Sequence, residues 1–511
     1  MKKNKQLLVN MIASLATLAI NLIIGFCFTP IVVNKAGGEA YGFVSLSNSM
    51  INYITIFTIA LNSVAGRFIT IKIHQNKIKE ANEYFTSVLV ANIIISLILI
   101  TFGVPIIMFL DKIINIPVYL VKSTKILFFL VLFNFIISIL GTVFTVATFI
   151  TNKLYLSNII NVICSLVRIA ILYLSFKYIS TNIIFFGVSS FVSSIVAIIF
   201  NIYLTLKLIP NIKINKKFFN VKKIVELVSS GIWNSITKIA QVLSDGLDLL
   251  VTNLWVSTYA MGQLSLAKIV SSYMSMLISN IISLFSPQLT KYYAKGDINS
   301  LVKELKLSMK ISSFFSNIPF CFVMVYSGIF FELWVPSQNS HVLHVLTILS
   351  VQAVIVSGAI TALNNVFVIT NNLKVNSIFW IIISFIDVGL VAFLLKFTNL
   401  GVYAVAGVST FVGIIANLIF VPLYACHCLK VKWNTFYGQI LRYTTTTILI
   451  LFIVYIFNKI TNFPVKWIWL FVDGIISCII SITINYFILL DSNERLYLFN
   501  IIKRKFFRRK I

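Results

Sequence analysis

The stretch ELVSSGIWNSITKIAQVLSDGLDLLVT, residues 226–252, is long and apolar enough to cross a membrane, yet it contains a lysine and two aspartates. Charged side chains at bilayer depth are costly, and they more often serve function than structure. Steps of four, three, four and three place five polar side chains on one helical face: Asn234, Lys238, Gln241, Asp245 and Asp248. Such a face needs water, a partner helix or a polar cargo in front of it. The stretch therefore favours a transporter over a plain membrane anchor.

Apolar segments of similar length recur along the whole chain of 511 residues, of which 59% are hydrophobic. A soluble protein cannot bury that much apolar surface in a core, so lipid must be the solvent for most of it. The sequence predicts an all-α polytopic membrane protein with about fourteen transmembrane helices. The expected spans are residues 7–33, 42–66, 86–110, 125–148, 157–177, 183–206, 226–252, 263–288, 309–333, 343–368, 377–397, 401–424, 438–458 and 467–490.

The basic residues are distributed asymmetrically. The net charge is +27, and most of the 41 Lys and Arg fall in alternate loops and at the termini. This is the positive-inside pattern of a protein whose basic loops face an anionic inner leaflet, so membrane lipid and not nucleic acid is the expected partner of the charge. An even number of spans puts both termini on the same side of the membrane. The basic residues at the termini and in alternate loops predict that this side is the cytoplasm. The first apolar run is too long for a signal peptide and is interpreted as the first span.

The chain contains an internal repeat. A shift of 220 residues aligns AYGFVSL at 40–46 with AMGQLSL at 260–266, and it pairs Thr70 with Thr290. Six spans separate equivalent points, so the repeats are parallel and predict two pseudo-symmetric six-helix bundles. The expected organisation is an N-terminal bundle at 1–206, a basic cytoplasmic linker at 207–225, a second bundle at 226–424, two additional spans at 438–490 and a basic cytoplasmic tail at 491–511.

Three cations are expected at membrane depth: Arg168, Lys238 and Lys268. They could line a hydrated cavity that binds an anionic substrate, or they could form ion pairs within the protein. Uncharged polar residues on the expected helix faces could line the same cavity: Asn48, Asn52, Asn234 and Gln241. They could equally hold neighbouring helices together by hydrogen bonds.

Acidic residues suggest a second role. Asp245, Asp248 and Asp387 could bind a proton or Na⁺ as a coupling ion, or they could pair with the deep cations. Glu332 and Asp473 fall near the outer ends of spans and are expected to be solvated. Arg67 stands where the second span meets the cytoplasm, where it could serve at the cytoplasmic entrance or extend to lipid phosphate.

No motif for catalysis is found in the sequence. It has no Gly-rich phosphate loop, no Walker lysine and no His-Glu metal motif, so the chain is not expected to be an enzyme. The six cysteines are scattered, and Cys426-His427-Cys428 cannot supply four well-placed ligands locally, so neither a metal nor another cofactor is expected, apart from H⁺ or Na⁺ as a counter-ion.

Four short segments resemble the polysaccharide transporter family of the multidrug/oligosaccharidyl-lipid/polysaccharide (MOP) exporter superfamily. They are Gly37-Gly38-Glu39-Ala40-Tyr41-Gly42, Asn62-Ser63-Val64-Ala65-Gly66-Arg67, Gly231-Ile232-Trp233-Asn234 and Ser286-Pro287-Gln288-Leu289-Thr290. The resemblance extends to the fourteen-span layout and covers nearly the whole chain.

The resemblance implies a Wzx-type flippase of a bacterial cytoplasmic membrane, which carries undecaprenyl-pyrophosphate-linked oligosaccharide repeat units of O-antigen, capsule or exopolysaccharide between leaflets. Alternating access with cation counter-transport would drive it, and a polysaccharide polymerase could be its partner. The cations would then face pyrophosphate, and the three aspartates would couple the ion. A lipid-II-type or teichuronic-acid precursor flippase and a drug/cation antiporter remain alternatives in the same superfamily. A polysaccharide polymerase would need a larger outer loop, and a non-transporting scaffold would leave the charged face unexplained.

Overall fold

The computed structural model describes residues 19–20, 22–151, 153–492 and 495, without the side chains of 154, 244 and 245. The described residues form helices and contain no strand, which confirms the all-α prediction. Twelve helices among them are long and apolar enough to cross a membrane, and each matches one of the expected spans. Of the other two, span 7–33 is described only at residues 19–20 and 22–33, where it contains most of helix Leu22–Ala36, and span 226–252 is interrupted.

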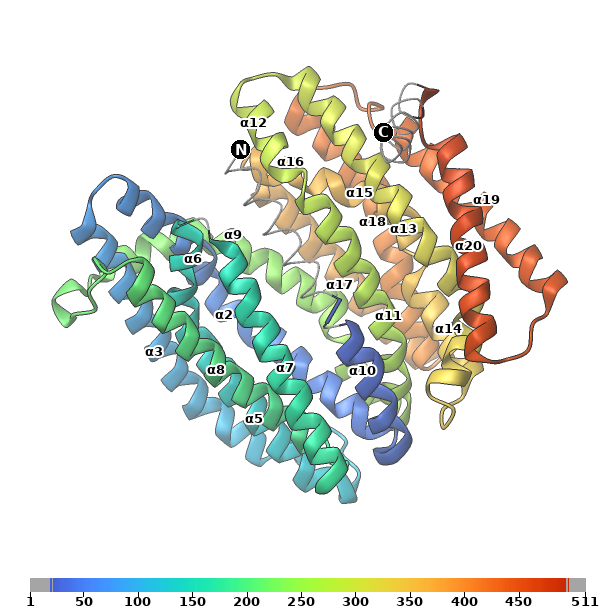
Figure 1. Cartoon of the computed structure of the whole chain (residues 1–511), viewed down its shortest axis with the longest axis horizontal. Coiled ribbons are helices and arrows are strands. Elements are labelled where there is room, and N and C mark those ends of the chain that lie inside the picture. The colour runs from blue at the N-terminus through green and yellow to red at the C-terminus, as the bar shows by residue number, and fades with distance from the viewer. Residues whose placement is uncertain (1–18, 21, 152, 493–494, 496–511) are drawn as a thin grey trace, which may run out of the picture. The chain divides into compact units, whose positions relative to one another are not determined.

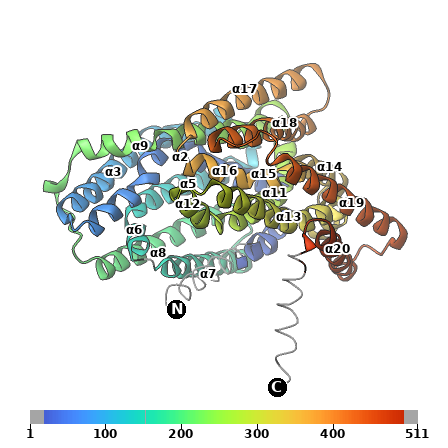
Figure 2. The ribbon, with the colours of Figure 1, turned by 90° about the horizontal axis from the view of Figure 1, so that it is seen from above.

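The helices divide into two compact units, shown in Figures 1 and 2. Unit 1 comprises residues 1–265 and 377–388, and unit 2 comprises 266–376 and 389–511. The first bundle was expected to end at 206, whereas the helices after the linker, up to residue 265, belong to unit 1. The bundle boundaries from the sequence stay a prediction, because compact packing and internal repetition need not divide a chain at the same place.

In unit 1 the long helix α2 is central and packs against α3, α5 and α9. Its principal helices are α2 (Gly38–His74), α3 (Ile78–Met108), α5 (Val121–Thr142), α7 (Leu154–Tyr178), α8 (Ile184–Leu208), α9 (Val221–Gln241) and α10 (Asp248–Trp255). Shorter elements connect them: α4 (Leu110–Ile113), η1 (Val118–Leu120), η2 (Val143–Thr145), α6 (Val146–Ile150), η3 (Lys216–Phe218) and the π-helix η4 (Val242–Gly246).

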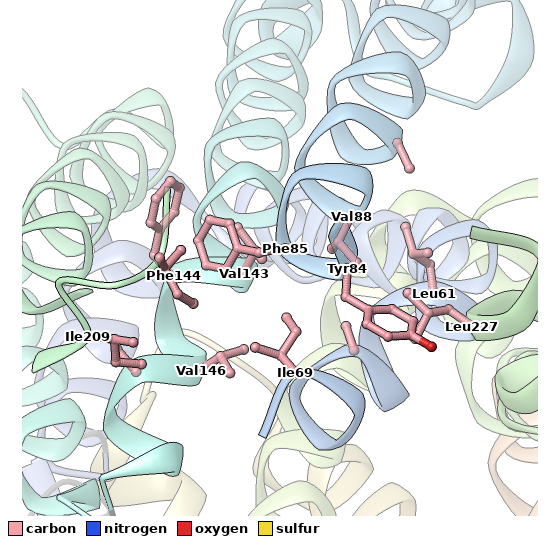
Figure 3. Packing of buried hydrophobic residues seen from close by; sticks show 14 residues of the cluster. Leu61, Ile69, Tyr84, Phe85, Val88, Val143, Phe144, Val146, Ile209 and Leu227 are labelled. Carbon is pink, nitrogen blue, oxygen red and sulfur yellow. The ribbon is translucent and has the colours of Figure 1, made fainter. Parts of the chain in front are cut away.

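A cluster of buried apolar side chains holds α2, α3 and the η2–α6 turn of unit 1 together. Figure 3 shows Ile69 of α2, Tyr84 and Phe85 of α3, and Phe144 of η2 directed into it, all of them buried. Phe85 and Phe144 meet edge to face with ring centroids 5.5 Å apart, an arrangement that aromatic pairs favour. Leu227 of α9 also enters the cluster, so α9 is fixed to unit 1 by apolar packing as well as by polar contacts.

In unit 2 the long helix α13 is central and packs against α12, α14, α15, α19 and α20. The elements are α12 (Ser286–Ala294), α13 (Ile298–Trp334), α14 (Ser340–Val351), α15 (Val354–Ile360), η5 (Thr361–Leu363), α16 (Asn364–Ile369), α18 (Val402–Leu429), α19 (Tyr437–Thr461) and α20 (Trp467–Ile488). Two helices have residues in both units: α11 (Thr258–Ser283) and α17 (Leu373–Phe397).

The helix bounds repeat with the 220-residue period seen in the sequence. The helix α2 runs from residue 38 to 74, and the pair α11 and α12 runs from 258 to 294. The helices that follow begin at Ile78 and Ile298. Between them, Asn76 and Gly296 occupy the same place in the turn, and both have a positive φ, 58° and 71°. Asparagine and glycine are the residues that tolerate this left-handed conformation, so both turns are built by the same local chemistry.

Candidate functional site

The helices α2 and α9 approach each other closely enough for backbone contact. A Cβ atom on Gly231 of α9 would lie 1.9 Å from the carbonyl oxygen of Ala60 of α2, so only glycine fits there. One turn further along α9, the Ser235 hydroxyl donates to the carbonyl oxygen of Ile56 at 2.9 Å. This proximity brings the polar faces of the two helices within hydrogen-bonding distance.

Three residues expected to contact substrate meet on this pair of helices. Lys238 Nζ donates to Asn52 Oδ1 at 3.0 Å, which joins the cation of α9 to the amide of α2. Asn234, one turn before Lys238, donates through Nδ2 to Ser63 Oγ at 2.9 Å. Lys238 and Asn234 are half-buried, and Asn52 is exposed. The arrangement leaves a lysine in the last turn of α9, on a polar surface that this helix shares with α2.

The helical face of residues 226–252 does not continue in one register. The α-helix α9 ends at Gln241, the π-helix η4 follows at Val242–Gly246, and α10 begins at Asp248. A π-helix accommodates one additional residue, which turns the following side chains by about 100° relative to a regular helix. The regular helical face is therefore interrupted, and a common face for Asp248, Asn234 and Lys238 stays a prediction. Tyr53 of α2 donates its hydroxyl to the carbonyl oxygen of Gly246 and so supports the break.

Two of the three acids expected to bind the coupling ion are buried in unit 1. Asp248 is 6% exposed and Asp387, on α17, is 3% exposed. Segment 377–388 of α17 is held to α9 because Ser384 Oγ donates to the Ala240 carbonyl oxygen at 2.9 Å. Tyr53 lies within electrostatic reach of Asp248. The side chain of the third acid, Asp245, lies outside the described residues, and the coupling role of all three stays a prediction.

The other expected site residues occupy different positions. Arg168 on α7 is half-buried, and its charge reaches Tyr41 of α2. Lys268 on α11 is half-buried and belongs to unit 2. Three residues are exposed on their helices: Asn48, whose amide donates to the Val44 carbonyl, Gln241 at the end of α9, and Arg67 on α2. Their roles at the substrate or the cytoplasmic entrance stay predictions.

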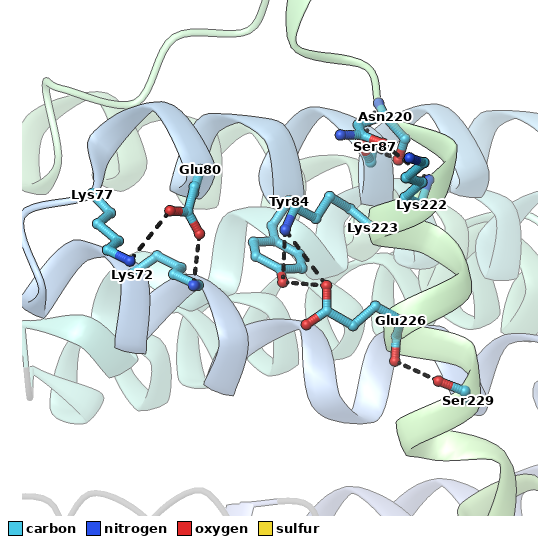
Figure 4. Close-up of polar contacts among 10 residues, drawn as sticks. All are labelled: Lys72, Lys77, Glu80, Tyr84, Ser87, Asn220, Lys222, Lys223, Glu226 and Ser229. Atoms are coloured by element: carbon cyan, nitrogen blue, oxygen red, sulfur yellow. Dashed lines mark hydrogen bonds and ion pairs between the residues drawn. The ribbon is translucent and has the colours of Figure 1, made fainter.

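A polar junction that the sequence did not indicate joins α9 to α3 (Figure 4). Tyr84 Oη donates to Glu226 Oε2 at 2.6 Å, and Lys223 Nζ lies 3.5 Å from the same carboxylate oxygen. The Lys223 ammonium also lies 4.6 Å from the centroid of the Tyr84 ring, which adds a cation–π contact. Ser87 Oγ accepts from the backbone N–H of Asn220 at 2.9 Å. The expected linker 207–225 is thus bound to α3 at its end.

Asp473 differs from its expected environment. Its place near the end of a span predicted solvation, but the side chain is only 3% exposed and lies beside Tyr326 of α13. Glu332, which carried the same expectation, is exposed. Position along a span does not distinguish the two acids, because burial depends on which face the neighbouring helices cover.

The fold is shared with transporters of the MOP superfamily. The lipid II flippase MurJ in an inward closed conformation superposes with a TM-score of 0.67 at 16% identity, over 94% of this chain and 98% of that one. An inward-facing MATE multidrug resistance transporter superposes with a TM-score of 0.63 at 14% identity, over 81% of this chain and 94% of that one. The chain is therefore a multi-pass membrane protein with the MATE and MurJ type of fold.

One curated relative aligns over most of the chain. The uncharacterized membrane protein EpsK of Bacillus subtilis (strain 168) is 27% identical over 428 residues, which is 84% of this chain and 85% of that protein. No protein-family model matches the chain.

Proposed function

We propose that the protein is a flippase that moves polyprenyl-pyrophosphate-linked oligosaccharide repeat units across a bacterial cytoplasmic membrane, with both termini in the cytoplasm. The observation that carries the proposal is the Lys238–Asn52 contact, which presents a cation on a polar α2–α9 face in a fold shared with a lipid II flippase. The asymmetry of Lys and Arg between alternate loops supports the orientation.

The chemistry of such a substrate explains why a cation belongs on this face. A pyrophosphate and several sugars cannot enter hydrocarbon without polar partners, whereas a polyprenyl tail can remain in lipid. A lysine at membrane depth costs up to about 3 kcal/mol, so a cation there is retained for what it binds. Lys238 would meet the pyrophosphate, and the amides of Asn52 and Asn234 would bind sugar hydroxyls. Arg168 and Lys268 would add positive charge along the route.

Cation counter-transport would supply the driving force for alternating access. Asp248 and Asp387 are buried carboxylates of unit 1, and a carboxylate binds a proton or Na⁺ when its solvation is poor. The π-helix between Lys238 and Asp248 gives the segment a place at which its two halves can move separately, because such bulges weaken regular backbone hydrogen bonding. Binding of the ion on one side of the break would then change the position of the cation on the other.

The test measures flipping by the full chain in proteoliposomes that contain a fluorescent undecaprenyl-pyrophosphate oligosaccharide, with quenching of the label in the outer leaflet as the readout. Lys238→Ala should slow flipping about tenfold or more, because a charge-assisted contact with phosphate is lost. Arg168→Ala and Lys268→Ala should slow it as well. Lys303→Ala, which removes an exposed lysine of α13, is the matched control.

Equal rates in the Lys238→Ala and wild-type proteins would reject the proposed substrate contact. Flipping of lipid II at a rate equal to that of the oligosaccharide carrier would favour the lipid-II-type alternative. Export of cationic drugs without flipping of either lipid would favour a drug/cation antiporter.

A further inference from the structure

The helix α20 buries a row of polar side chains along one face. Asp473, Ser477, Ser481 and Asn485 recur at every fourth residue, and all four are buried. A spacing of four residues keeps side chains on the same side of an α-helix. The row lies in unit 2, and α20 packs there against α13 and α19.

The facing helix α13 is also polar where it is buried. Its fully buried polar side chains include Ser308, Ser312, Asn317 and Tyr326. Asn317 and Asn485 exchange amide hydrogen bonds at 2.8 Å in both directions, so the two helices meet face to face at this point. That amide pair is the ordinary polar contact that joins helices in lipid.

The remaining polar atoms of this seam are not paired in that way. Among the described residues, three buried oxygens of the α20 row have no hydrogen-bond partner in the protein: Asp473 Oδ1, Ser477 Oγ and Ser481 Oγ. A seam that served only to join two helices would pair these groups with each other, because an unsatisfied polar group inside a membrane protein is costly. Buried oxygens that lack a protein partner along one helix face are the groups that bind buried water.

Asp473 is the ionisable group of the seam. The Tyr326 hydroxyl of α13 and Ser477 of α20 lie beside its carboxyl group. Tyr326 is its titratable neighbour and interacts with the carboxyl group through the hydroxyl. Among the described residues of α13 and α19, no lysine or arginine has an electrostatic interaction with this carboxyl group. A carboxylate without a cation in the interior of a membrane protein is costly, and a bound proton removes its charge.

We propose that Asp473 is a proton-binding site of unit 2, reached along the hydroxyl row of α20. Successive members of the row are four residues apart, or about 6 Å along the helix, a gap that one water molecule bridges with two hydrogen bonds of about 2.8 Å. From Asn485 to Asp473 the row covers about 18 Å. A proton enters from water at the Asn485 end, each bridging oxygen accepts one proton and releases another, and the last proton binds a carboxylate oxygen of Asp473. No other bond is made or broken.

Infrared difference spectroscopy of the full chain in lipid nanodiscs tests the site without any substrate. The wild-type protein should show a protonated-carboxyl C=O band that changes with pH, and Asp473→Asn should lose that band. Asp111→Asn, which alters an exposed acid outside the spans, should retain it. Tyr326→Phe, which keeps the carboxyl group but removes the neighbouring hydroxyl, should shift the band frequency. Identical spectra for wild type and Asp473→Asn across the titration would overturn the proposal, as would a band that responds to Na⁺ and not to pH.

The hydroxyl row is tested by hydrogen–deuterium exchange of the same band. Replacement of both Ser477 and Ser481 by Ala should slow exchange about tenfold, because two polar anchors of bridging water are removed. Thr483→Ala is the matched control, since Thr483 is exposed on another face of α20. An unchanged exchange rate in the double variant would overturn the route. Both readouts are independent of lipid flipping. The experiments can therefore reject the Asp473 proton site without rejecting the flippase proposal, and the flipping assay can reject the flippase proposal without rejecting the site.

Discussion

Gly42 and Gly262, the two glycines that the 220-residue shift pairs in the sequence, touch each other. A Cβ atom on Gly42 would lie 3.0 Å from the Cα of Gly262, and a Cβ atom on Gly262 would lie 2.5 Å from the carbonyl oxygen of Gly38. The beginnings of α2 and α11 therefore cross with backbone against backbone. The contact agrees with the repeated helix bounds and explains why both copies of the repeat keep glycine at this place.

Gly262→Ala should destabilise the protein by about 1–3 kcal/mol, because the added methyl group forces two backbones apart. The measurement is the thermal unfolding temperature in detergent, followed by tryptophan fluorescence. Gly389→Ala in α17 is the control, since no atom lies within 4 Å of the added Cβ and alanine is the better helix former. If both variants melt together, the close crossing is absent.

Tyr84→Phe should release the end of the linker from α3. The substitution removes the 2.6 Å hydrogen bond to Glu226 and leaves the ring in its apolar cluster, at an expected cost of about 1 kcal/mol because Glu226 is partly exposed. Hydrogen exchange of residues 213–225 should accelerate more than exchange elsewhere in unit 1. The matched control is Tyr173→Phe on the exposed surface of α7. Equal protection of the linker in all three proteins would contradict this role of Tyr84.

Asp491 should make unit 2 sensitive to acid. It forms ion pairs with Lys310 at 2.8 Å and with Arg442 at 3.0 Å, and these cations hold the pKa of the Asp491 carboxyl below its ordinary value. The stabilisation is complete above the pKa of the unfolded carboxyl, about 3.9, and is lost as the pH falls through the lower folded value.

The comparison that tests this pair is Asp491→Asn against wild type over a range of pH. The wild-type protein should melt at a higher temperature at neutral pH, by an amount that corresponds to about 1 kcal/mol because Asp491 is half exposed. Below a pH of about 4 the difference should narrow, since the unfolded carboxyl then binds a proton, and it should vanish once the pH is low enough to protonate the folded carboxylate as well. Glu332→Gln, which changes an exposed acid of α13, should not alter the dependence. A difference that stays constant down to strongly acidic pH would rule out the ion pairs as its cause.

The spans were predictable because a membrane helix needs only length and apolar composition, and both are local properties of the sequence. The repeat was predictable for a similar reason, since the AYGFVSL and AMGQLSL segments and the turns after them carry it. The π-helix at 242–246 was not predictable, because one additional residue in a helix leaves the apolar pattern of residues 226–252 unchanged.

Long-range packing accounts for the remaining differences. Tyr84 and Glu226 are 142 residues apart, and no local pattern shows that they meet. Asp473 was expected in solvent from its place along the span, yet it is buried beside Tyr326 of α13. For the candidate site, composition indicated Lys238 and Asn52 individually, whereas their 3.0 Å contact depends on the close approach at Gly231.

Tyr53→Phe tests whether the π-helix serves transport. The Tyr53 hydroxyl donates to the carbonyl oxygen of Gly246, in the π-helix, and the same side chain lies within electrostatic reach of Asp248. Loss of one hydroxyl should cost about 1 kcal/mol at most in stability, because the ring remains in place. If the π-helix links ion binding to the movement of Lys238, the variant should instead change the dependence of flipping on pH or Na⁺.

The measurement is the initial flipping rate in proteoliposomes under imposed H⁺ and Na⁺ gradients, with Tyr173→Phe as the control. A proportional loss of rate under every gradient would indicate a structural role alone, whereas a changed ion dependence with near-normal stability would place Tyr53 in the coupling mechanism.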